Sequence, residues 1–175
     1  MRLLWMEQTN PKGRPASLFY LLLLVLVFIL VPPDCVAEII KSRAALTIDA
    51  STGEPLFSKN SNRRLPPAST TKLITAIVAI ENESLSKVVT ISRKASHAAP
   101  TKAGFKEGDQ VTIEGLLYAA LLVSANDAAV ALGEAIAGSE QRFVPLMNEK
   151  ALSIGAQDTK FINATGLPGN GQYTT

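Results

Sequence analysis

A serine and a lysine three residues apart give this sequence its clearest chemical signal. Ser69-Thr70-Thr71-Lys72 follows Pro66-Pro67 and begins an apolar stretch. At this spacing on a helix, Ser69 and Lys72 lie on the same face. The amine can then accept the hydroxyl proton while the serine oxygen attacks a carbonyl carbon, which is covalent catalysis without histidine. The chain has a single histidine, His97, which favours a serine–lysine pair over a histidine-dependent site.

Ser124-Ala125-Asn126 is a second polar group that could do chemistry. It separates an apolar run at residues 116–123 from a stretch of small residues at 128–137. Such a group either caps a helix or faces a cleft, and both interpretations remain open. In a cleft opposite Ser69, the hydroxyl of Ser124 could relay protons, and the amide of Asn126 could hold a peptide group of a substrate.

Neither short pattern is specific by itself. Ser84-Leu85-Ser86-Lys87 repeats the first pattern, and Ser58-Lys59-Asn60 repeats the second, both in polar sequence. The two selected groups differ because each lies against an apolar helical stretch, where an unpaired polar group is costly. A buried Lys72 is especially costly, which favours a functional interpretation over a purely structural one.

Periodicity predicts the elements that would hold these side chains. Alternating apolar residues predict a β-hairpin from strands at 44–50 and 56–58, with Gly53 in the turn. A helix is predicted from near Pro67 to about Glu81, and the hairpin is expected to pack against it. The apolar stripe expected to face the core of this helix consists of Leu73, Ala76, Ile77 and Ile80.

A strand and three helices are predicted beyond this point. The strand covers residues 88–91, and Thr112 is expected to cap the helix that contains residues 116–123. The next helix, 128–137, should end at Gly138. The last, 140–154, should end at Gly155 and bury one face, formed by Phe143, Met147 and Ala151.

The N-terminal segment has the pattern of an export signal. An unbroken apolar run at residues 18–31 follows a basic region and precedes Cys35-Val36-Ala37, which fits a signal-peptidase site. As a helix the run would be about 21 Å long, shorter than a hydrocarbon core of about 30 Å. Residues 1–37 are therefore predicted to be a cleaved signal peptide. An uncleaved segment, which would associate the protein with a membrane, is the alternative.

Composition excludes several classes of function. The 175 residues carry a net charge of +2 without a basic run, so no nucleic-acid partner is expected. A hydrophobic content of 47% excludes disorder. One histidine and no clustered carboxylates predict no metal site, and no cofactor is expected.

The paired motifs and their flanking residues resemble those of D-alanyl-D-alanine carboxypeptidases, which are low-molecular-mass penicillin-binding proteins. The resemblance extends from about residue 44 to residue 175. It rests on four ordered blocks: Pro67-Ala68-Ser69-Thr70-Thr71-Lys72, Gly108-Asp109-Gln110-Val111-Thr112, Leu121-Leu122-Val123-Ser124-Ala125-Asn126-Asp127-Ala128-Ala129 and Asn163-Ala164-Thr165-Gly166-Leu167-Pro168.

This resemblance implies roles for four side chains. Ser69 would be the acylated nucleophile and Lys72 its general base. Ser124 would pass a proton to the leaving D-alanine, and Asn126 would hold the substrate backbone. The implied substrates are peptidoglycan stem peptides ending in D-Ala-D-Ala, with β-lactam antibiotics as mimics. The implied location is the periplasm or the cell-surface side of a bacterial cytoplasmic membrane, after export.

The resemblance also implies an α+β fold of the β-lactamase/transpeptidase-like class, in which a helical cluster packs on an antiparallel sheet. The family's third motif, K-T-G, is not found beyond the second motif. Residues 38–175 are therefore expected to be the N-terminal portion of the catalytic domain, with only its first hairpin and helices. Two alternatives remain: a catalytically incomplete fragment, and a class A-like β-lactamase, for which no catalytic glutamate can be assigned.

Overall fold

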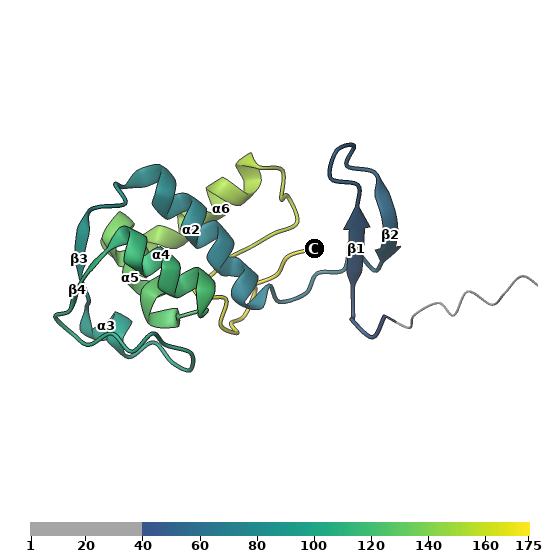
Figure 1. Cartoon of the computed structure of the whole chain (residues 1–175). Coiled ribbons are helices and arrows are strands. Elements are labelled where there is room, and N and C mark those ends of the chain that lie inside the picture. Colours follow the sequence, from purple (N-terminus) through teal and green to yellow (C-terminus); the bar gives the residue numbers. More distant parts are fainter. Residues whose placement is uncertain (1–39) are drawn as a thin grey trace, which may run out of the picture. The chain divides into compact units, whose positions relative to one another are not determined.

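The structure is a computed structural model that describes residues 40–175, so the predicted signal peptide at 1–37 lies outside the described residues. Helices predominate in the described part of the chain, accompanied by two antiparallel strand pairs, β1–β2 and β3–β4. In chain order, the elements are β1 (Ala45–Ile48), β2 (Pro55–Lys59), the 3₁₀ turn η1 (Ala68–Thr70), α2 (Thr71–Asn82), β3 (Val88–Thr90), α3 (Arg93–Ser96), β4 (Gln110–Thr112), α4 (Ile113–Leu122), α5 (Asn126–Ala137) and α6 (Glu140–Ser153) (Figure 1).

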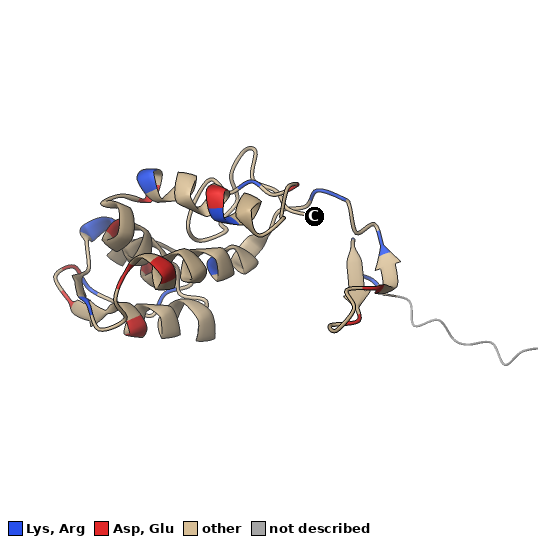
Figure 2. Ribbon diagram, turned by 90° about the horizontal axis from the view of Figure 1, so that it is seen from above, with Lys and Arg blue, Asp and Glu red and all other residues tan. Residues whose placement is uncertain are grey.

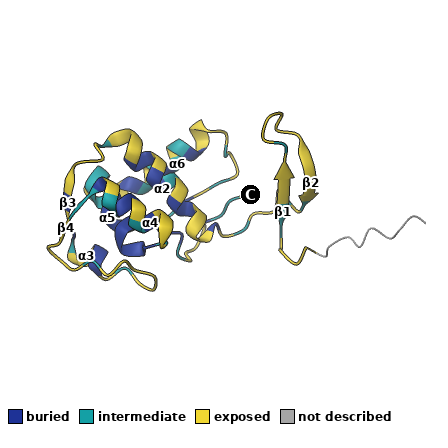
Figure 3. Cartoon of the chain, in the orientation of Figure 1, coloured by how far each residue is buried: buried dark blue, intermediate teal, exposed yellow. Residues whose placement is uncertain are grey.

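Helix α5 is the centre of the helical part. It packs against α2, α3, α4 and α6, and its residues 126–133 are all buried. Its small side chains allow the neighbouring helices to approach closely. At Gly133, for example, an added methyl group would lie 3.2 Å from the ring of Phe143 on α6. The buried sides of the helices face one another across this centre (Figure 3).

Two apolar clusters fill the interior. The first joins side chains from α2, β3, α3, α4 and α5. The second joins α2 and α6 with two residues of the C-terminal segment, Phe161 and Ala164. The α6 face predicted from the sequence is confirmed, because Phe143, Met147 and Ala151 are all buried in this second cluster.

Of the four residues predicted to form the core face of α2, only Ala76 is buried, and the other three are exposed. Leu73 is 57% exposed and Ile80 is 53% exposed. The face that is buried consists of Thr71, Lys72, Thr75, Ala76, Val78 and Ala79. Two of the polar side chains on this face have hydrogen-bond partners: the Thr75 hydroxyl donates to the Ala164 carbonyl at 2.8 Å, and the Lys72 amine donates to the Thr165 carbonyl at 2.9 Å.

The hairpin forms as predicted, with β1 antiparallel to β2. Asp49 shapes the turn, since its carboxylate accepts hydrogen bonds from the Ser51 hydroxyl and from the N–H groups of Ser51 and Thr52. These bonds lower the pKa of Asp49 to about 2. The expected burial of the hairpin against α2 is not observed, since its large apolar side chains are exposed: Leu46, Ile48, Leu56 and Phe57.

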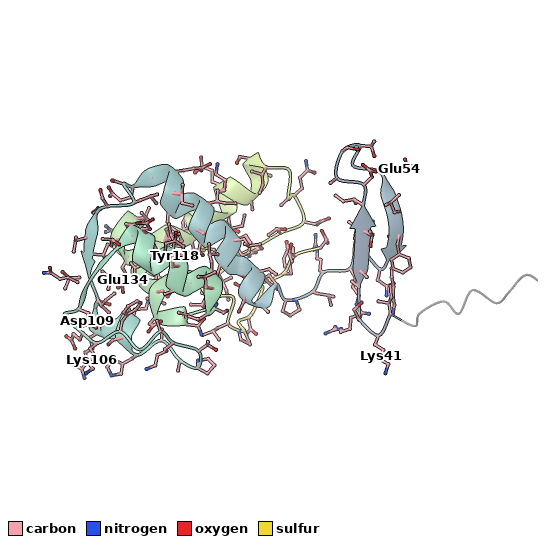
Figure 4. The ribbon with its side chains drawn as sticks, viewed as in Figure 1. Lys41, Glu54, Lys106, Asp109, Tyr118 and Glu134 are labelled. Atoms are coloured by element: carbon pink, nitrogen blue, oxygen red, sulfur yellow. The ribbon has the colours of Figure 1, made fainter. Side chains whose placement is uncertain are left out.

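Strand β4 and helix α3 were not predicted. β4 pairs with the predicted strand β3, and the turn before it is held by the Lys106 N–H, which donates to the Asp109 carboxylate at 2.8 Å (Figure 4). Helix α3 spans one turn. Two predicted helix boundaries are confirmed. The Thr112 hydroxyl accepts from the Gly115 N–H at the start of α4, and Gly138, with φ 73°, ends α5.

Charged side chains of both signs are interspersed over the helices (Figure 2). Within residues 40–175, no helix is both long enough and apolar enough to cross a membrane.

Candidate active site

The predicted serine–lysine pair lies where the chain enters α2. Ser69 belongs to the 3₁₀ turn η1, and Lys72 is the second residue of α2. The Lys72 amine lies 3.3 Å from the Ser69 hydroxyl oxygen. Ser69 is exposed to solvent, whereas Lys72 is only 2% exposed. The short spacing thus presents the Ser69 hydroxyl at the surface and the Lys72 amine behind it in the interior.

Ser124 completes a triangle of polar side chains. It lies between α4 and α5, and its hydroxyl is 2.9 Å from that of Ser69 and 3.3 Å from the Lys72 amine. The capping interpretation does not apply, because the N-cap residue of α5 is Ala125, and α5 has no side-chain cap. Of the two interpretations left open by the sequence, the structure selects the one in which Ser124 faces Ser69.

Two residues at this site have left-handed backbone conformations that are unusual outside glycine. Ser124 has φ 58°, and Ala68, which immediately precedes Ser69, has φ 48°. Each costs about 1–2 kcal/mol for an L-residue. Such conformations persist where the surrounding structure imposes them, and they are common at functional sites. Here they aim two hydroxyl groups at one amine.

The environment of Lys72 favours its neutral form. Its amine donates to the Thr165 carbonyl oxygen at 2.9 Å, which is its shortest hydrogen bond. Burial lowers the pKa of Lys72 below its ordinary value, since removal from water disfavours the charged form. The hydrogen-bond partners of this amine are two hydroxyls and one carbonyl, and none of these carries a charge. A neutral amine with this access to a hydroxyl can act as a general base.

Asn126 is close in sequence but is not part of this hydrogen-bonded triangle. It is the first residue of α5 and is 3% exposed. Its side-chain amide donates to the Ala99 carbonyl at 3.3 Å, and its backbone N–H donates to the Thr101 carbonyl at 2.8 Å. In this structure, Asn126 therefore holds the 99–101 segment beside the site.

Asp127 is a supporting residue that the sequence analysis missed. It is fully buried, and its carboxylate accepts from three successive backbone N–H groups at residues 103–105. Asn126 and Asp127 together fix the loop that runs from residue 99 to residue 105. The available signal was its position inside an otherwise apolar, small-residue stretch, since a buried aspartate is almost always paired.

The sequence analysis also missed the contribution of the segment at 163–167. It supplies the carbonyl of Thr165, and its Gly166 lies directly against the chain before Ser69. Gly166 has φ 82°, and a methyl group there would overlap the carbonyl oxygen of Ala68. The glycine is therefore required twice, by its conformation and by this close approach. A backbone carbonyl leaves no trace in the identity of its own side chain. The sequence could therefore point to the motif at residues 163–168 but not to the acceptor within it.

The repeated patterns elsewhere behave as ordinary surface features. The hydroxyls of Ser84 and Ser86 hydrogen-bond to each other, while Lys87 pairs with Glu83. His97 is exposed at the end of α3. Among the described residues, no group of three or more His, Cys, Asp or Glu side chains could hold a metal ion.

An exposed serine, a buried amine and a second serine lie within hydrogen-bonding distance of one another, an arrangement that could carry out acyl transfer through a serine ester. Comparison with known proteins agrees with this class. The chain belongs to the Peptidase_S11 family, the D-alanyl-D-alanine carboxypeptidases, which it matches over residues 33–175.

Individual relatives are similar in sequence, and two solved structures are also similar in fold. The D-alanyl-D-alanine carboxypeptidase DacF of Bacillus subtilis is 36% identical over 140 residues, covering 77% of this chain and 36% of DacF. The crystal structure of DacD from Francisella tularensis is 40% identical with a TM-score of 0.74, covering 78% of this chain and 34% of that one. Penicillin binding protein 5 from Haemophilus influenzae is 30% identical with a TM-score of 0.72, over 77% of this chain and 41% of that one.

These comparisons confirm the transpeptidase-like fold class expected from the sequence. The chain spans about a third of the length of DacF and of the Francisella enzyme.

Proposed function

We propose that this protein is a serine-type D-Ala-D-Ala carboxypeptidase that removes the terminal D-alanine from peptidoglycan stem peptides. The observation that carries the proposal is the hydrogen-bonded triangle of Ser69, Lys72 and Ser124 around a buried amine. The names of the relatives supply the substrate class, which the triangle alone would leave open.

In the acylation step, the Ser69 oxygen attacks the carbonyl carbon of the penultimate D-alanine. Lys72 accepts the hydroxyl proton, and Ser124, which touches both groups, relays a proton to the amine of the departing D-alanine. The products of this step are free D-alanine and an ester on Ser69. Because Ser69 lies at the N-terminal end of α2, the positive end of the helix dipole also favours the negative charge that develops on the oxygen of the attacked carbonyl.

Water then attacks the ester, and the peptide leaves with a new carboxylate. Lys72, neutral again once its proton has left with the D-alanine, accepts a proton from this water and returns it to Ser69 as the ester breaks, which restores the resting site. Asn126 is proposed to hold the backbone of the substrate, in addition to the contact that it makes with Ala99. β-Lactam antibiotics are proposed to acylate Ser69 in the same way as the substrate. The names of the family and of its relatives favour this activity over that of a class A-like β-lactamase.

Activity should rise with pH as Lys72 loses its proton. Because only the neutral amine accepts a proton, D-alanine release should increase as pH rises through the pKa of Lys72, which burial places below the ordinary lysine value. The measurement is D-alanine release from a peptide ending in D-Ala-D-Ala, together with labelling by a fluorescent penicillin, across a pH series.

In the Lys72→Arg protein, release should fall by about 10²–10⁴-fold at every pH, because an arginine stays protonated. Equal rates in the two proteins would contradict the proposed base. Penicillin labelling without D-alanine release would support the alternative of a chain that binds substrate but does not complete turnover.

We also propose that residues 1–37 are an export signal and that residues 38–175 belong to the catalytic domain, which acts in the periplasm or at the cell surface. N-terminal sequencing of the exported protein should begin at Glu38, because Cys35-Val36-Ala37 fits the cleavage pattern. Recovery of the uncleaved N-terminus in the membrane fraction would instead support a retained anchor and membrane association.

A further inference from the structure

The segment that supplies the third partner of Lys72 is shaped by one side chain. The side-chain oxygen of Asn163 accepts hydrogen bonds from the Thr165 N–H at 3.2 Å, the Thr165 hydroxyl at 3.1 Å and the Gly166 N–H at 2.7 Å. Its amide group donates to the Leu167 carbonyl at 2.9 Å. These four bonds close a tight turn over residues 163–167, in the way that asparagine side chains organise turns.

This turn is attached to α2 at two successive points. The Ala164 carbonyl accepts from the Thr75 hydroxyl at 2.8 Å, and the Thr165 carbonyl accepts from the Lys72 amine at 2.9 Å. Gly166 rests against Ala68. The direction of the Thr165 carbonyl therefore depends on two sets of contacts: the hydrogen bonds of the Asn163 side chain within the turn, and the hydrogen bonds that the turn accepts from α2.

The carbonyl of Thr165 determines how the neutral amine of Lys72 can be oriented. A neutral amine has two N–H groups and one lone pair. A carbonyl oxygen can only accept, so one N–H is always used there. If the second N–H donates to the Ser124 oxygen, the Ser124 hydroxyl donates to the Ser69 oxygen at 2.9 Å. The lone pair then remains for the Ser69 proton, and every donor in the triangle has one acceptor.

We propose that Asn163 is a positioning residue for Lys72. Through the turn, it holds the Thr165 carbonyl at the amine, and this leaves the lone pair of the amine directed at Ser69. The inference rests on the proposed serine–lysine mechanism. It assigns to Asn163 a role that its sequence context, a glycosylation-like Asn163-Ala164-Thr165, does not suggest.

The test compares Asn163→Ala with Asn148→Ala. Asn148 is a matched control, because its side chain is also half-buried and makes three hydrogen bonds to backbone atoms of Val144 and Phe161, away from Lys72. Both variants should lower the thermal midpoint. Only Asn163→Ala should slow acylation by a fluorescent penicillin, by about tenfold to 10²-fold, because general-base catalysis depends on alignment. Asn148→Ala should stay within about twofold of the unmodified protein.

A second measurement does not depend on activity. In protein labelled with ¹³C at lysine Cε, the Lys72 methylene should show two separate proton resonances while the amine is held in one orientation. A Lys72→Arg sample identifies them. They should remain separate in Asn148→Ala, merge in Asn163→Ala, and separate again in Asn163→Asp, which keeps the side-chain oxygen acceptor.

Separate resonances in Asn163→Ala, with an unchanged acylation rate, would overturn the inference. If the unmodified protein is not acylated but the resonances behave as expected, the positioning role stands and the proposed function fails. If the resonances merge equally in both alanine variants, Asn163 has a general structural role and the inference is wrong.

Discussion

The Ser69→Ala protein is expected to show no labelling by a fluorescent penicillin, while the Ser84→Ala protein is labelled like the unmodified one. Both serines stand three residues before a lysine. Ser69 is exposed and lies 3.3 Å from a buried amine, whereas Lys87 is exposed and paired with Glu83. Only Ser69 therefore has a base that can take its proton, and without the Ser69 oxygen no ester can form.

The measurement is fluorescence of the labelled band after denaturation, which detects a covalent bond and not reversible binding. Equal thermal midpoints for the two variants would show that a missing label is not caused by unfolding. Persistent labelling of Ser69→Ala would contradict the assignment of the nucleophile, and loss of labelling in Ser84→Ala would identify the other motif as the reactive one.

The Gly166→Ala protein is expected to lose at least about 10²-fold in the rate of acylation and about 3 kcal/mol in the free energy of unfolding. The added methyl group would overlap the Ala68 carbonyl oxygen and would lie 2.8 Å from the Thr71 hydroxyl, on a residue with φ 82°. Either the turn at 163–167 or the chain before Ser69 must move. Both movements disturb the contacts of Lys72 and Ser69.

Gly171→Ala is the matched control for this change. Gly171 has φ 86°, nearly the same conformation, but an added methyl group there would meet no atom within 4 Å. It should cost only about 1–2 kcal/mol for the left-handed backbone, with acylation unchanged. Denaturant unfolding and the acylation rate are measured for both variants. Similar losses of activity in the two would mean that the approach of Gly166 to Ala68 has no specific role.

Local signals in the sequence predicted the parts of the fold that depend on neighbouring residues. Thr112 caps α4 and Gly138 ends α5, because a hydroxyl acceptor and a left-handed glycine are needed at those points whatever surrounds them. The spacing of Ser69 and Lys72 likewise fixes their proximity within one turn. Strand β4, by contrast, has three residues and depends on β3 for its hydrogen bonds, so its sequence carries little signal.

The error at α2 has a different cause. The apolar repeat of Leu73, Ile77 and Ile80 predicted the buried face on the assumption that polar residues avoid the interior. In the structure, Thr71, Lys72 and Thr75 are buried instead, close to residues 163–166. The hydrogen-bond partners of Lys72 and Thr75 lie 93 and 89 residues away in the sequence, and both are backbone oxygens. Contacts with the segment at 163–166, and not the apolar repeat, therefore decide which face of α2 is buried.

The buried Lys72 also ties the stability of the fold to the proton concentration. In an unfolded chain its amine returns to water and to an ordinary pKa, so the unfolded state holds this proton more tightly than the folded state does. Between the two pKa values, the contribution of Lys72 to the free energy of unfolding therefore increases with pH, by about 1.4 kcal/mol per pH unit at most. Below the lower pKa the folded protein carries the full cost of a charged, buried amine. The same desolvation that favours the neutral form of Lys72, the proposed base, therefore costs stability, and the folded protein bears this cost in full at every pH below the folded-state pKa of Lys72.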